Sequence, residues 1–217
     1  MSNVNDLGAS YDRAASAYAA TFVDELERKP SDRALLDAFA RRCQAGLTLN
    51  VGCGPGHVGR YTAQHGLAVG GVDLSREMAT IGHGLNPTMP FTVADVQSLP
   101  IRDRRVGGIT AFYSLIHLPR PARPHAFAEL RRVLVDGAPL LVAVHAGDGG
   151  LHTDEFLGHR VSLDVTLYRR DELAALLEDH DFRIDRLEQR APYRFEHPTD
   201  RLYGLARAGA DAPGIEI

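Results

Sequence analysis

The sequence predicts an α/β fold: a doubly wound, mostly parallel seven-stranded sheet with an N-terminal helical cap and a C-terminal antiparallel strand pair. Three observations support this prediction. From Leu47 onward, short apolar runs alternate with stretches that have helical periodicity, which is typical of strands joined by crossover helices. A glycine cluster directly follows the first apolar run. The last two strand-like segments have no helix between them, which favours an antiparallel pair.

Residues 1–45 are expected to form a cap of two helices. Apolar side chains recur every three to four residues from Tyr11 to Phe22 and again from Leu35 to Ala40, as on one face of a helix. The segment Pro30-Ser31-Asp32 lies between the two groups and breaks the pattern. We expect the apolar face of the first helix to cover a ligand cleft rather than to contact a membrane.

Residues 46–146 are expected to form the core of the sheet. The expected strands are 48–51, 67–73, 90–94, 108–113 and 140–145. The expected helices are 57–65, 75–83 and 126–134. Alternation of this kind predicts parallel strands with right-handed crossovers and helices on both faces of the sheet.

Residues 147–217 depart from this alternation. A helix over Arg170–His180 is followed by two strand-like segments, Phe182–Arg190 and Arg201–Ala208. The insert Ala146–Leu167 is rich in glycine at first and resembles a strand over Val161–Leu167, so we expect it to close over a substrate of modest size. No internal repeat or low-complexity linker divides the chain, which favours one domain over 1–217.

The composition is that of an ordinary globular protein, with 217 residues, 44% hydrophobic and 24% charged. No apolar run approaches the roughly 20 residues that span a bilayer. The segment Met1–Asp6 lacks the basic and apolar regions of a secretion signal, and two cysteines, Cys43 and Cys53, form no disulfide framework. We therefore expect a cytoplasmic protein.

A net charge of −4 without a basic tail argues against nucleic acid as a partner.

The glycine cluster is the strongest functional signal in the chain. Gly52, Gly54 and Gly56 follow the buried strand Thr48–Val51 and precede a helix that begins at His57. Glycine lets the backbone turn sharply and approach a ligand, and a helix N-terminus presents free N–H groups. The pattern predicts a binding site for a nucleotide-like or carboxylate-bearing cofactor.

The residues alone leave two cofactor classes open. Gly54–Gly59 matches the G-x-G-x-x-G pattern of dinucleotide-binding proteins, and Asp73 ends the second strand about twenty residues after Gly52, where it could accept from two ribose hydroxyls. Three features favour a different cofactor. Gly52 stands directly at the strand end, Asp95 follows the third strand where it could accept from an exocyclic amine, and the sheet ends in an antiparallel pair.

Together these motifs resemble the class I S-adenosylmethionine-dependent methyltransferases, in particular the small methyltransferase 11-like group, over nearly the whole chain. The segments that carry the resemblance are Tyr11–Tyr18, Leu49–His57, Gly71–Met78, Ala111–His117 and Glu129–Leu134.

The resemblance implies a role for each part of the loop and its neighbours. The backbone of Gly52–Gly56 would hold the methionine moiety and Asp73 the ribose, while Met78 would pack on the adenine, Asp95 and Val96 would read its edge, and Tyr18 would close over the methionine end. The full set of expected cofactor-binding residues is Tyr18, Gly52, Cys53, Gly54, Gly56, Asp73, Leu74, Met78, Asp95, Val96 and Tyr113.

Two positions depart from the family pattern. Asn50 replaces the acidic residue that is usual before Val51, and Asp136–Pro139 replaces a common Pro-Gly-Gly turn before the fifth strand. Neither position belongs to the expected contacts with the cofactor, so we expect binding to persist.

Methyl transfer from a sulfonium needs alignment, exclusion of water and, for some nucleophiles, a base. His117 and His145 follow the fourth strand and end the fifth, at the edge where ligands bind such sheets, and are the candidate bases. Tyr113 and Asp148 are candidates for shaping the acceptor site.

No histidine or cysteine spacing indicates a metal site, so none is expected. Five arginines in the C-terminal half could gather around an anionic substrate: Arg160, Arg169, Arg170, Arg190 and Arg194.

The leading hypothesis is methylation of a small-molecule acceptor, preferably at oxygen, by a monomer or homodimer. An NAD-dependent oxidoreductase is an alternative, but the chain has no Tyr-x-x-x-Lys pair and no lysine besides Lys29. A non-catalytic protein that binds S-adenosylmethionine is a third reading, motivated by Asn50 and Asp136. A nucleic-acid or protein methyltransferase is disfavoured by the acidic balance.

Overall fold

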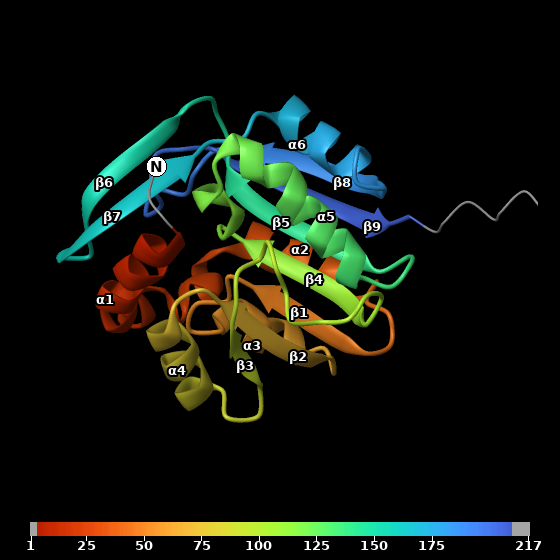
Figure 1. Cartoon of the computed structure of the whole chain (residues 1–217), viewed down its shortest axis with the longest axis horizontal. Helices are drawn as coiled ribbons and strands as arrows, with labels where there is room; N and C mark the ends of the chain where they lie inside the picture. The colour runs from red at the N-terminus through yellow and green to blue at the C-terminus, as the bar shows by residue number, and fades with distance from the viewer. Residues whose placement is uncertain (1–3, 210–217) are drawn as a thin grey trace, which may run out of the picture.

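The computed structural model describes residues 4–209. Residues 1–3 of the segment Met1–Asp6, which we compared with a secretion signal, lie outside this range. Its main sheet has seven strands in the order β3-β2-β1-β4-β5-β9-β8 (Figure 1). Strands β1 to β5 pair in parallel and β9 runs antiparallel to both β5 and β8. The predicted fold class, a mostly parallel sheet closed by an antiparallel pair, is confirmed.

The strands of this sheet are β1 (Leu47–Val51), β2 (Ala68–Asp73), β3 (Phe91–Val93), β4 (Val106–Phe112), β5 (Pro139–His145), β8 (Phe182–Arg190) and β9 (Arg201–Ala208). The helices are α1 (Val4–Phe22), α2 (Pro30–Ala40), α3 (His57–Ala63), α4 (Arg76–Leu85), α5 (Arg123–Val133) and α6 (Arg170–Glu178). Short 3-10 turns lie at Glu25–Arg28, Leu115–His117 and Arg120–Ala122.

The sheet is covered on both faces, and its strand β5 is apolar at every position from Pro139 to Val144. In β5, Leu140 and Val142 belong to the core cluster that includes α5 and α6, whereas Leu141 and Ala143 belong to the cluster that includes α2. Successive strand residues point to opposite faces, so an uninterrupted apolar run buries both. The central strands are thereby packed on both faces, and their carboxyl ends position the loops of the site.

A second, two-stranded sheet stands apart from the main one. It is the hairpin of β6 (Gly150–Phe156) and β7 (His159–Thr166), which lies beside α1 in Figure 1. The sequence predicts only its second strand. β6 is mostly polar and exposed, and the turn places Leu157 at φ 52° and Gly158 at φ 78°. A leucine in the left-handed region is not a turn signal, so the first strand was not predicted.

A buried ion-pair network joins the N-terminal cap to the C-terminal strands. Lys29 Nζ lies 2.7 Å from a carboxylate oxygen of Glu25 and 3.3 Å from one of Glu196. Arg190 contacts Glu196 at 2.7 Å and Asp32 at 3.0 Å. The only lysine of the chain is therefore structural, and it lies outside the cavity described below.

None of the helices over residues 4–209 combines the length and apolarity needed to cross a bilayer.

Candidate active site

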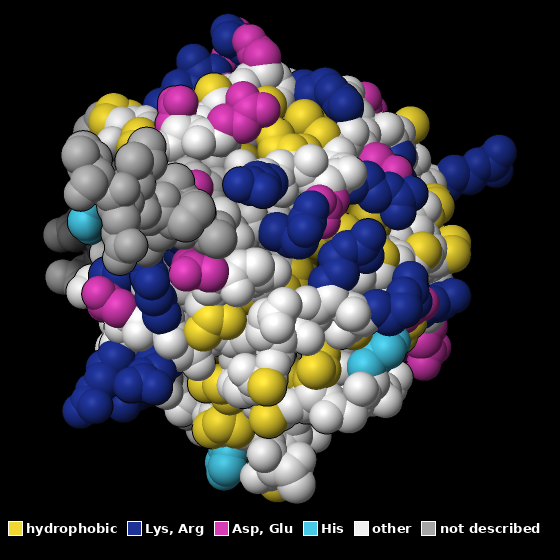
Figure 2. All heavy atoms as spheres, turned by 90° about the vertical axis from the view of Figure 1, so that its right-hand side faces the viewer, with side chains coloured by type: hydrophobic (Ala, Val, Ile, Leu, Met, Phe, Trp, Pro, Cys, Tyr) yellow, Lys and Arg dark blue, Asp and Glu magenta, His cyan; other side chains and the backbone are white. Residues whose placement is uncertain are grey.

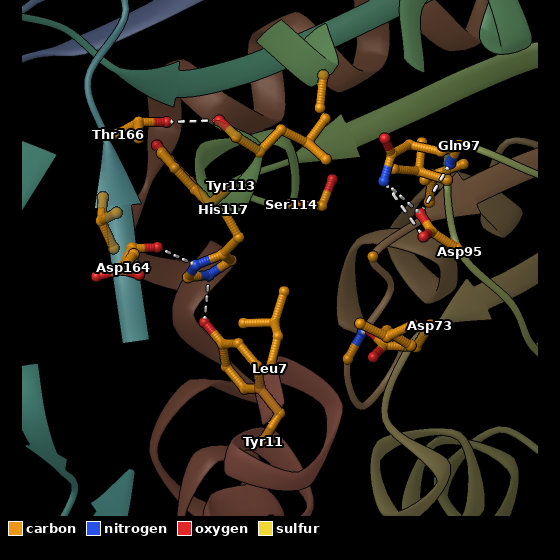
Figure 3. A pocket seen from close by; sticks show the side chains of 18 of the residues that line it. Leu7, Tyr11, Asp73, Asp95, Gln97, Tyr113, Ser114, His117, Asp164 and Thr166 are labelled. Carbon is orange, nitrogen blue, oxygen red and sulfur yellow. Dashed lines mark hydrogen bonds between the residues drawn. The ribbon is translucent and has the colours of Figure 1, made fainter. Parts of the chain in front are cut away.

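The main cavity opens at the carboxyl ends of the parallel strands and has a volume of about 670 Å³. Ligand pockets usually measure about 300–1,000 Å³, so the cavity has room for a sizeable ligand. Its walls come from α1, the loops after β1 to β4 and the β6–β7 hairpin. Figure 3 shows Asp73 and Asp95 on one side and Tyr11, His117 and Asp164 on the other.

The glycine loop forms the floor of this cavity. Gly52, Gly54 and Gly56 have φ values of 62°, 51° and 82°, which residues with a Cβ rarely adopt. A Cβ on Gly52 would stand 2.0 Å from Cβ of Ser114, so only glycine fits there. A Cβ on Gly54 would point at the Tyr18 ring, 3.5 Å away, and both residues line the cavity.

Two of the expected cofactor contacts do not line the cavity. Cys53 is only 2% exposed, and its thiol lies against Gly71 of the neighbouring strand, where burial raises its pKa. Gly56 packs against Met89 and Phe91. Successive loop residues point in opposite directions, so Cys53 points toward the neighbouring strand while Gly52 and Gly54 face the cavity. Cys53 and Gly56 thus shape the loop without their side-chain positions facing the cavity.

Asp73 supplies a carboxylate with free capacity to accept hydrogen bonds. One oxygen accepts from the N–H of Gly54 at 2.7 Å and the other from the N–H of Ser75 at 2.9 Å. Burial raises the pKa of Asp73, while these N–H groups counteract the shift. A carboxylate offers about four lone-pair sites, so about two remain for a ligand. That number matches the two vicinal hydroxyls of a ribose.

The next wall has the character of a site for a flat, apolar ring with a polar edge. Leu74, Met78 and Val96 line it, and Met78 is 2% exposed. Asp95 accepts from the backbone N–H of Gln97 at 2.9 Å and from its side-chain amide (Figure 3). This wall contains the residues that the sequence predicts for an adenine, and Gln97 is an addition.

Ser114 is a cavity residue that the sequence analysis missed. Its hydroxyl oxygen is buried and has no hydrogen-bond partner within residues 4–209. A buried hydroxyl without a partner carries a desolvation penalty of about 1–3 kcal/mol, which a polar ligand atom would remove. The unpaired hydroxyl, the glycine cradle and the carboxylate of Asp73 together fit a cofactor that has a polar methionine end and a ribose. The signal that could have found Ser114 is its place directly after the fourth strand.

His117 lies in the cavity with both ring nitrogens engaged. Its Nδ1 lies 2.8 Å from the backbone carbonyl oxygen of Asp164, and its Nε2 lies 2.7 Å from the hydroxyl of Tyr11 (Figure 3). A carbonyl oxygen only accepts hydrogen bonds, so Nδ1 donates to it, Nε2 is unprotonated, and Tyr11 donates to Nε2. Burial lowers the pKa of His117. The ring is therefore held neutral, with one lone pair directed at Tyr11.

His145, the other candidate base, does not line the cavity. Its ring lies beside Tyr113 and His197, with Nδ1 2.8 Å from the hydroxyl oxygen of Thr199. Burial and the nearby Arg201 charge lower the pKa of His145 to about 3. Both histidines follow strands at the same edge, but the β8–β9 connection covers the end of β5. Sequence position alone could not distinguish them.

Tyr113 does line the cavity, and it does so in a constrained backbone conformation. Its φ is 54°, and its hydroxyl lies 3.4 Å from that of Tyr203. Asp148, the other candidate for shaping the acceptor site, is exposed and hydrogen-bonds Arg120 outside the cavity lining.

Asn50 has a structural role that explains its departure from the family pattern. Its side chain donates to the hydroxyl of Thr110 at 3.2 Å and accepts from the N–H of Gly59 at 3.2 Å. It is 1% exposed and does not line the cavity. An amide satisfies both partners without burying a charge, so this position anchors the first turn of α3 to the sheet.

The lysine and arginine side chains of the described residues lie outside the cavity lining. Asp73, Asp95 and Asp164, by contrast, line the cavity. Figure 2 shows many Lys and Arg side chains on one outer face, interspersed with acidic ones. The five arginines that could have gathered around an anionic substrate do not reach the cavity: Arg160, Arg169, Arg170, Arg190 and Arg194. The same part of the chain contains no cluster of histidine, cysteine and acidic residues suited to a metal ion.

Comparisons with known proteins agree with this geometry. A family model described as a methyltransferase domain matches residues 48–137. The malonyl-[acyl-carrier protein] O-methyltransferase of Pseudescherichia vulneris is 33% identical over 204 residues, with 81% of this chain and 79% of that protein covered.

Solved structures share the fold at lower identity. The DhpI–SAH complex aligns with a TM-score of 0.74 at 21% identity, covering 96% of this chain and 98% of that one. The [4+2]-cyclase SpnF aligns with a TM-score of 0.73 at 18% identity, covering 97% and 98%. One neighbour is a complex with S-adenosylhomocysteine (SAH) and the other is named a cyclase, so at this identity the likeness shows the fold alone.

Proposed function

The chain belongs to the class I S-adenosylmethionine-dependent methyltransferases, and we propose that it methylates an oxygen atom of a small-molecule acceptor with His117 as the base. The observation that carries the proposal is the position of His117. It is a neutral imidazole that lines the same cavity as the glycine loop and Asp73, with an unprotonated Nε2.

The proposed cofactor contacts follow the two sides of the cavity. Gly52, Gly54 and Ser114 would hold the methionine end, with Tyr18 over it, and the free lone pairs of Asp73 would accept from the ribose hydroxyls. Asp95 and Val96 would meet the adenine edge, and Met78 its face. When bound, S-adenosylmethionine supplies a methyl group already activated by a sulfonium.

The protein then has three tasks. It must orient the acceptor oxygen in line with the methyl carbon and sulfur, exclude water, and take up the proton of the acceptor. Tyr11, His117 and Thr166 lie on the side of the cavity opposite Asp73 and Asp95 (Figure 3). We propose that residues 4–45 and the insert Ala146–Leu167 enclose the acceptor there, and that His117 Nε2 takes up the proton.

The relative from Pseudescherichia vulneris has an O-methyltransferase name, which supports oxygen as the methylated atom. Both cysteines are free thiols, which supports the proposed cytoplasmic location. We propose a monomer or homodimer without nucleic acid or membrane as a partner.

The test is to incubate the full chain with S-adenosylmethionine carrying a trideuterated methyl group and four sets of small acceptors, which offer hydroxyl, carboxyl, amine or thiol groups. Mass spectrometry of the products, together with SAH formation, identifies the methylated atom. Label on an oxygen atom, lost in His117→Asn, is the expected result. Label only on nitrogen or sulfur would contradict oxygen transfer. Cofactor binding without label on any acceptor would favour a non-catalytic protein.

A further inference from the structure

We propose that the acceptor is a neutral, largely apolar molecule whose un-ionised hydroxyl takes the place that the Tyr11 hydroxyl occupies at His117, and that a carboxylate is not accepted there. This inference rests on the proposed oxygen methylation and names the acceptor class of that same site.

The hydrogen bond at Nε2 has a fixed direction. Nδ1 of His117 donates to the Asp164 carbonyl, so in the neutral ring Nε2 can only accept. The hydroxyl of Tyr11 donates to it at 2.7 Å. A phenol or alcohol can replace this donor group one for one. A carboxylate has no proton to donate, so it would place its own lone pairs against that of Nε2.

The charge of the lining also disfavours an anion. Over the described residues, no arginine or lysine side chain lines the cavity, and Asp73, Asp95 and Asp164 do. His152 lines it as well, and its hydrogen bonds to Asp164 and Asp154 raise its pKa, so those two carboxylates already offset its positive charge. An anionic acceptor would lose its hydration shell without gaining an uncompensated cationic partner from the protein, which is unfavourable. The lowered pKa of His117 prevents the imidazole from acting as that cation near neutral pH.

The cavity wall around His117 is largely apolar. Leu118 and Pro119 follow it in the chain, and Leu151 and Val165 of the hairpin complete the wall. Thr166 uses its hydroxyl to donate to the backbone carbonyls of the segment after β4. The wall therefore offers mainly apolar contacts, which suit a hydrocarbon or aromatic skeleton.

This acceptor class differs from that in the name of the 33% identical relative. A malonyl group carried on another molecule ends in a free carboxylate. The two proteins would use the same methyl donor and differ in the methyl acceptor. In this chain Nε2 of His117 presents a lone pair, whereas an anionic methyl acceptor would need a hydrogen-bond donor at that point.

The transfer step is balanced with the groups present. The acceptor O–H bond breaks and its proton moves to Nε2 of His117. The acceptor oxygen forms a bond to the methyl carbon, and the carbon–sulfur bond breaks with its electron pair remaining on sulfur. The products are a methyl ether, SAH and the protonated His117, which then passes its proton to water.

The experiment uses one pair of probes with the same skeleton, 2-naphthol and 2-naphthoate. Calorimetry first establishes that the full chain binds SAH, and failure at that step would count against the proposed function itself. The nitrogen-15 spectrum of the histidines is then recorded in the SAH complex, with His117 assigned from His117→Asn. Each probe is titrated while the two ring nitrogens of His117 are followed.

We expect 2-naphthol to shift the Nε2 resonance while the ring stays neutral, and 2-naphthoate to leave it unchanged. Preferred binding of 2-naphthoate with conversion of His117 to the doubly protonated form would overturn the proposal. So would the absence of any His117 response to either probe, because this side of the cavity would then not be the acceptor site.

A variant pair tests the shared place of the two hydroxyls. Tyr11→Phe removes the competing donor, so the affinity for 2-naphthol should rise about 3- to 10-fold, as expected for one net hydrogen bond. Tyr61→Phe is the matched control, since the Tyr61 hydroxyl binds Asp37 outside the cavity lining. Equal affinities in the wild type and Tyr11→Phe would contradict the exchange.

Discussion

The proposed chemistry of the site depends on single atoms of His117. The Asp164 carbonyl fixes the Nδ1–H tautomer, and the Tyr11 hydroxyl marks the point from which Nε2 receives a hydrogen. Hydrogen bonds that orient an imidazole and select its tautomer are what a general base requires. His145 is neutral as well, but its ring faces Tyr113, His197 and Thr199 instead of the cavity.

His117→Asn should therefore lower the rate of methyl transfer by about 10²- to 10⁴-fold, the usual contribution of a general base. His145→Asn should keep a rate close to that of the wild type. Initial rates of SAH formation with a hydroxyl acceptor measure both. A larger loss of rate in His145→Asn than in His117→Asn would show that His145, and not His117, is the base.

The pH dependence follows from the same surroundings. Burial lowers the pKa of His117 below its ordinary value of 6.5. A base acts in its neutral form, so the rate should stay constant as the pH falls through 6.5 and decline only below the lowered pKa. A rate profile with an acidic limb above pH 6.5 would be inconsistent with His117 as the base.

At the residue scale, the sequence predicts which residues lie at the carboxyl edge of the sheet better than it predicts contacts between distant side chains. The positions of Tyr18, Gly52, Gly54 and Asp73 around one cavity could be predicted, because each lies at a strand end or in a recognisable motif. The partnership of Tyr11 with His117 could not. It joins residues 106 positions apart through the angle at which the cap crosses the sheet.

Among the elements, the glycine loop depends most on exact backbone geometry. Gly52 combines a φ of 62° with a virtual Cβ 2.0 Å from Cβ of Ser114. The loop after β1 and the segment after β4 are therefore in direct contact, and their packing shapes the floor of the cavity.

Gly52→Ala should destabilise the protein by about 1–3 kcal/mol through overpacking, with about 1–2 kcal/mol more for the left-handed backbone, and should weaken SAH binding. Gly84→Ala is the matched control. Its Cβ would meet nothing within 4 Å, and alanine in this exposed helix position should stabilise by about 0.5–1 kcal/mol. Urea unfolding and calorimetry measure both effects. Equal stability of the two variants would contradict the role of Gly52.

Element type was predictable here wherever apolar periodicity was strong. The final antiparallel pair has the expected bounds, and the ends of the parallel strands differ from the expected ones by at most two residues. The hairpin strand Gly150–Phe156 was missed because none of its residues is buried and most of its side chains are polar. A strand without a buried face leaves no hydrophobic pattern to recognise.

At the scale of the whole molecule, the ion-pair network ties the cap to the C-terminal strands. Burial alone would raise the pKa of Glu196, but its hydrogen bonds to Arg190 and the nearby Arg201 and Lys29 charges lower it to about 2. The ordinary value is 4.5, so the folded state binds this proton less readily than the unfolded state. The stabilisation is complete above pH 4.5 and is lost as the pH falls toward 2.

Glu196→Gln should thus be less stable than the wild type by about 3 kcal/mol at pH 7, as expected when a buried charge loses its partner. The difference should shrink steadily between pH 4.5 and pH 2, because the wild type then loses the same charge. Urea unfolding across this range measures it, with the exposed Glu188→Gln as the control. A difference that does not change with pH would contradict the network.

This fold is expected to hold S-adenosylmethionine through Asp73. The most direct measurement is calorimetric titration of the full chain with S-adenosylmethionine, SAH and NAD, repeated with Asp73→Asn and the exposed control Asp179→Asn. We predict binding of both sulfur ligands and not of NAD, weakened about 10- to 100-fold in Asp73→Asn, since hydrogen bonds to a charged group contribute about 1.5–3 kcal/mol. The control should bind as the wild type does. Binding of NAD alone, or unchanged SAH affinity in Asp73→Asn, would contradict the account.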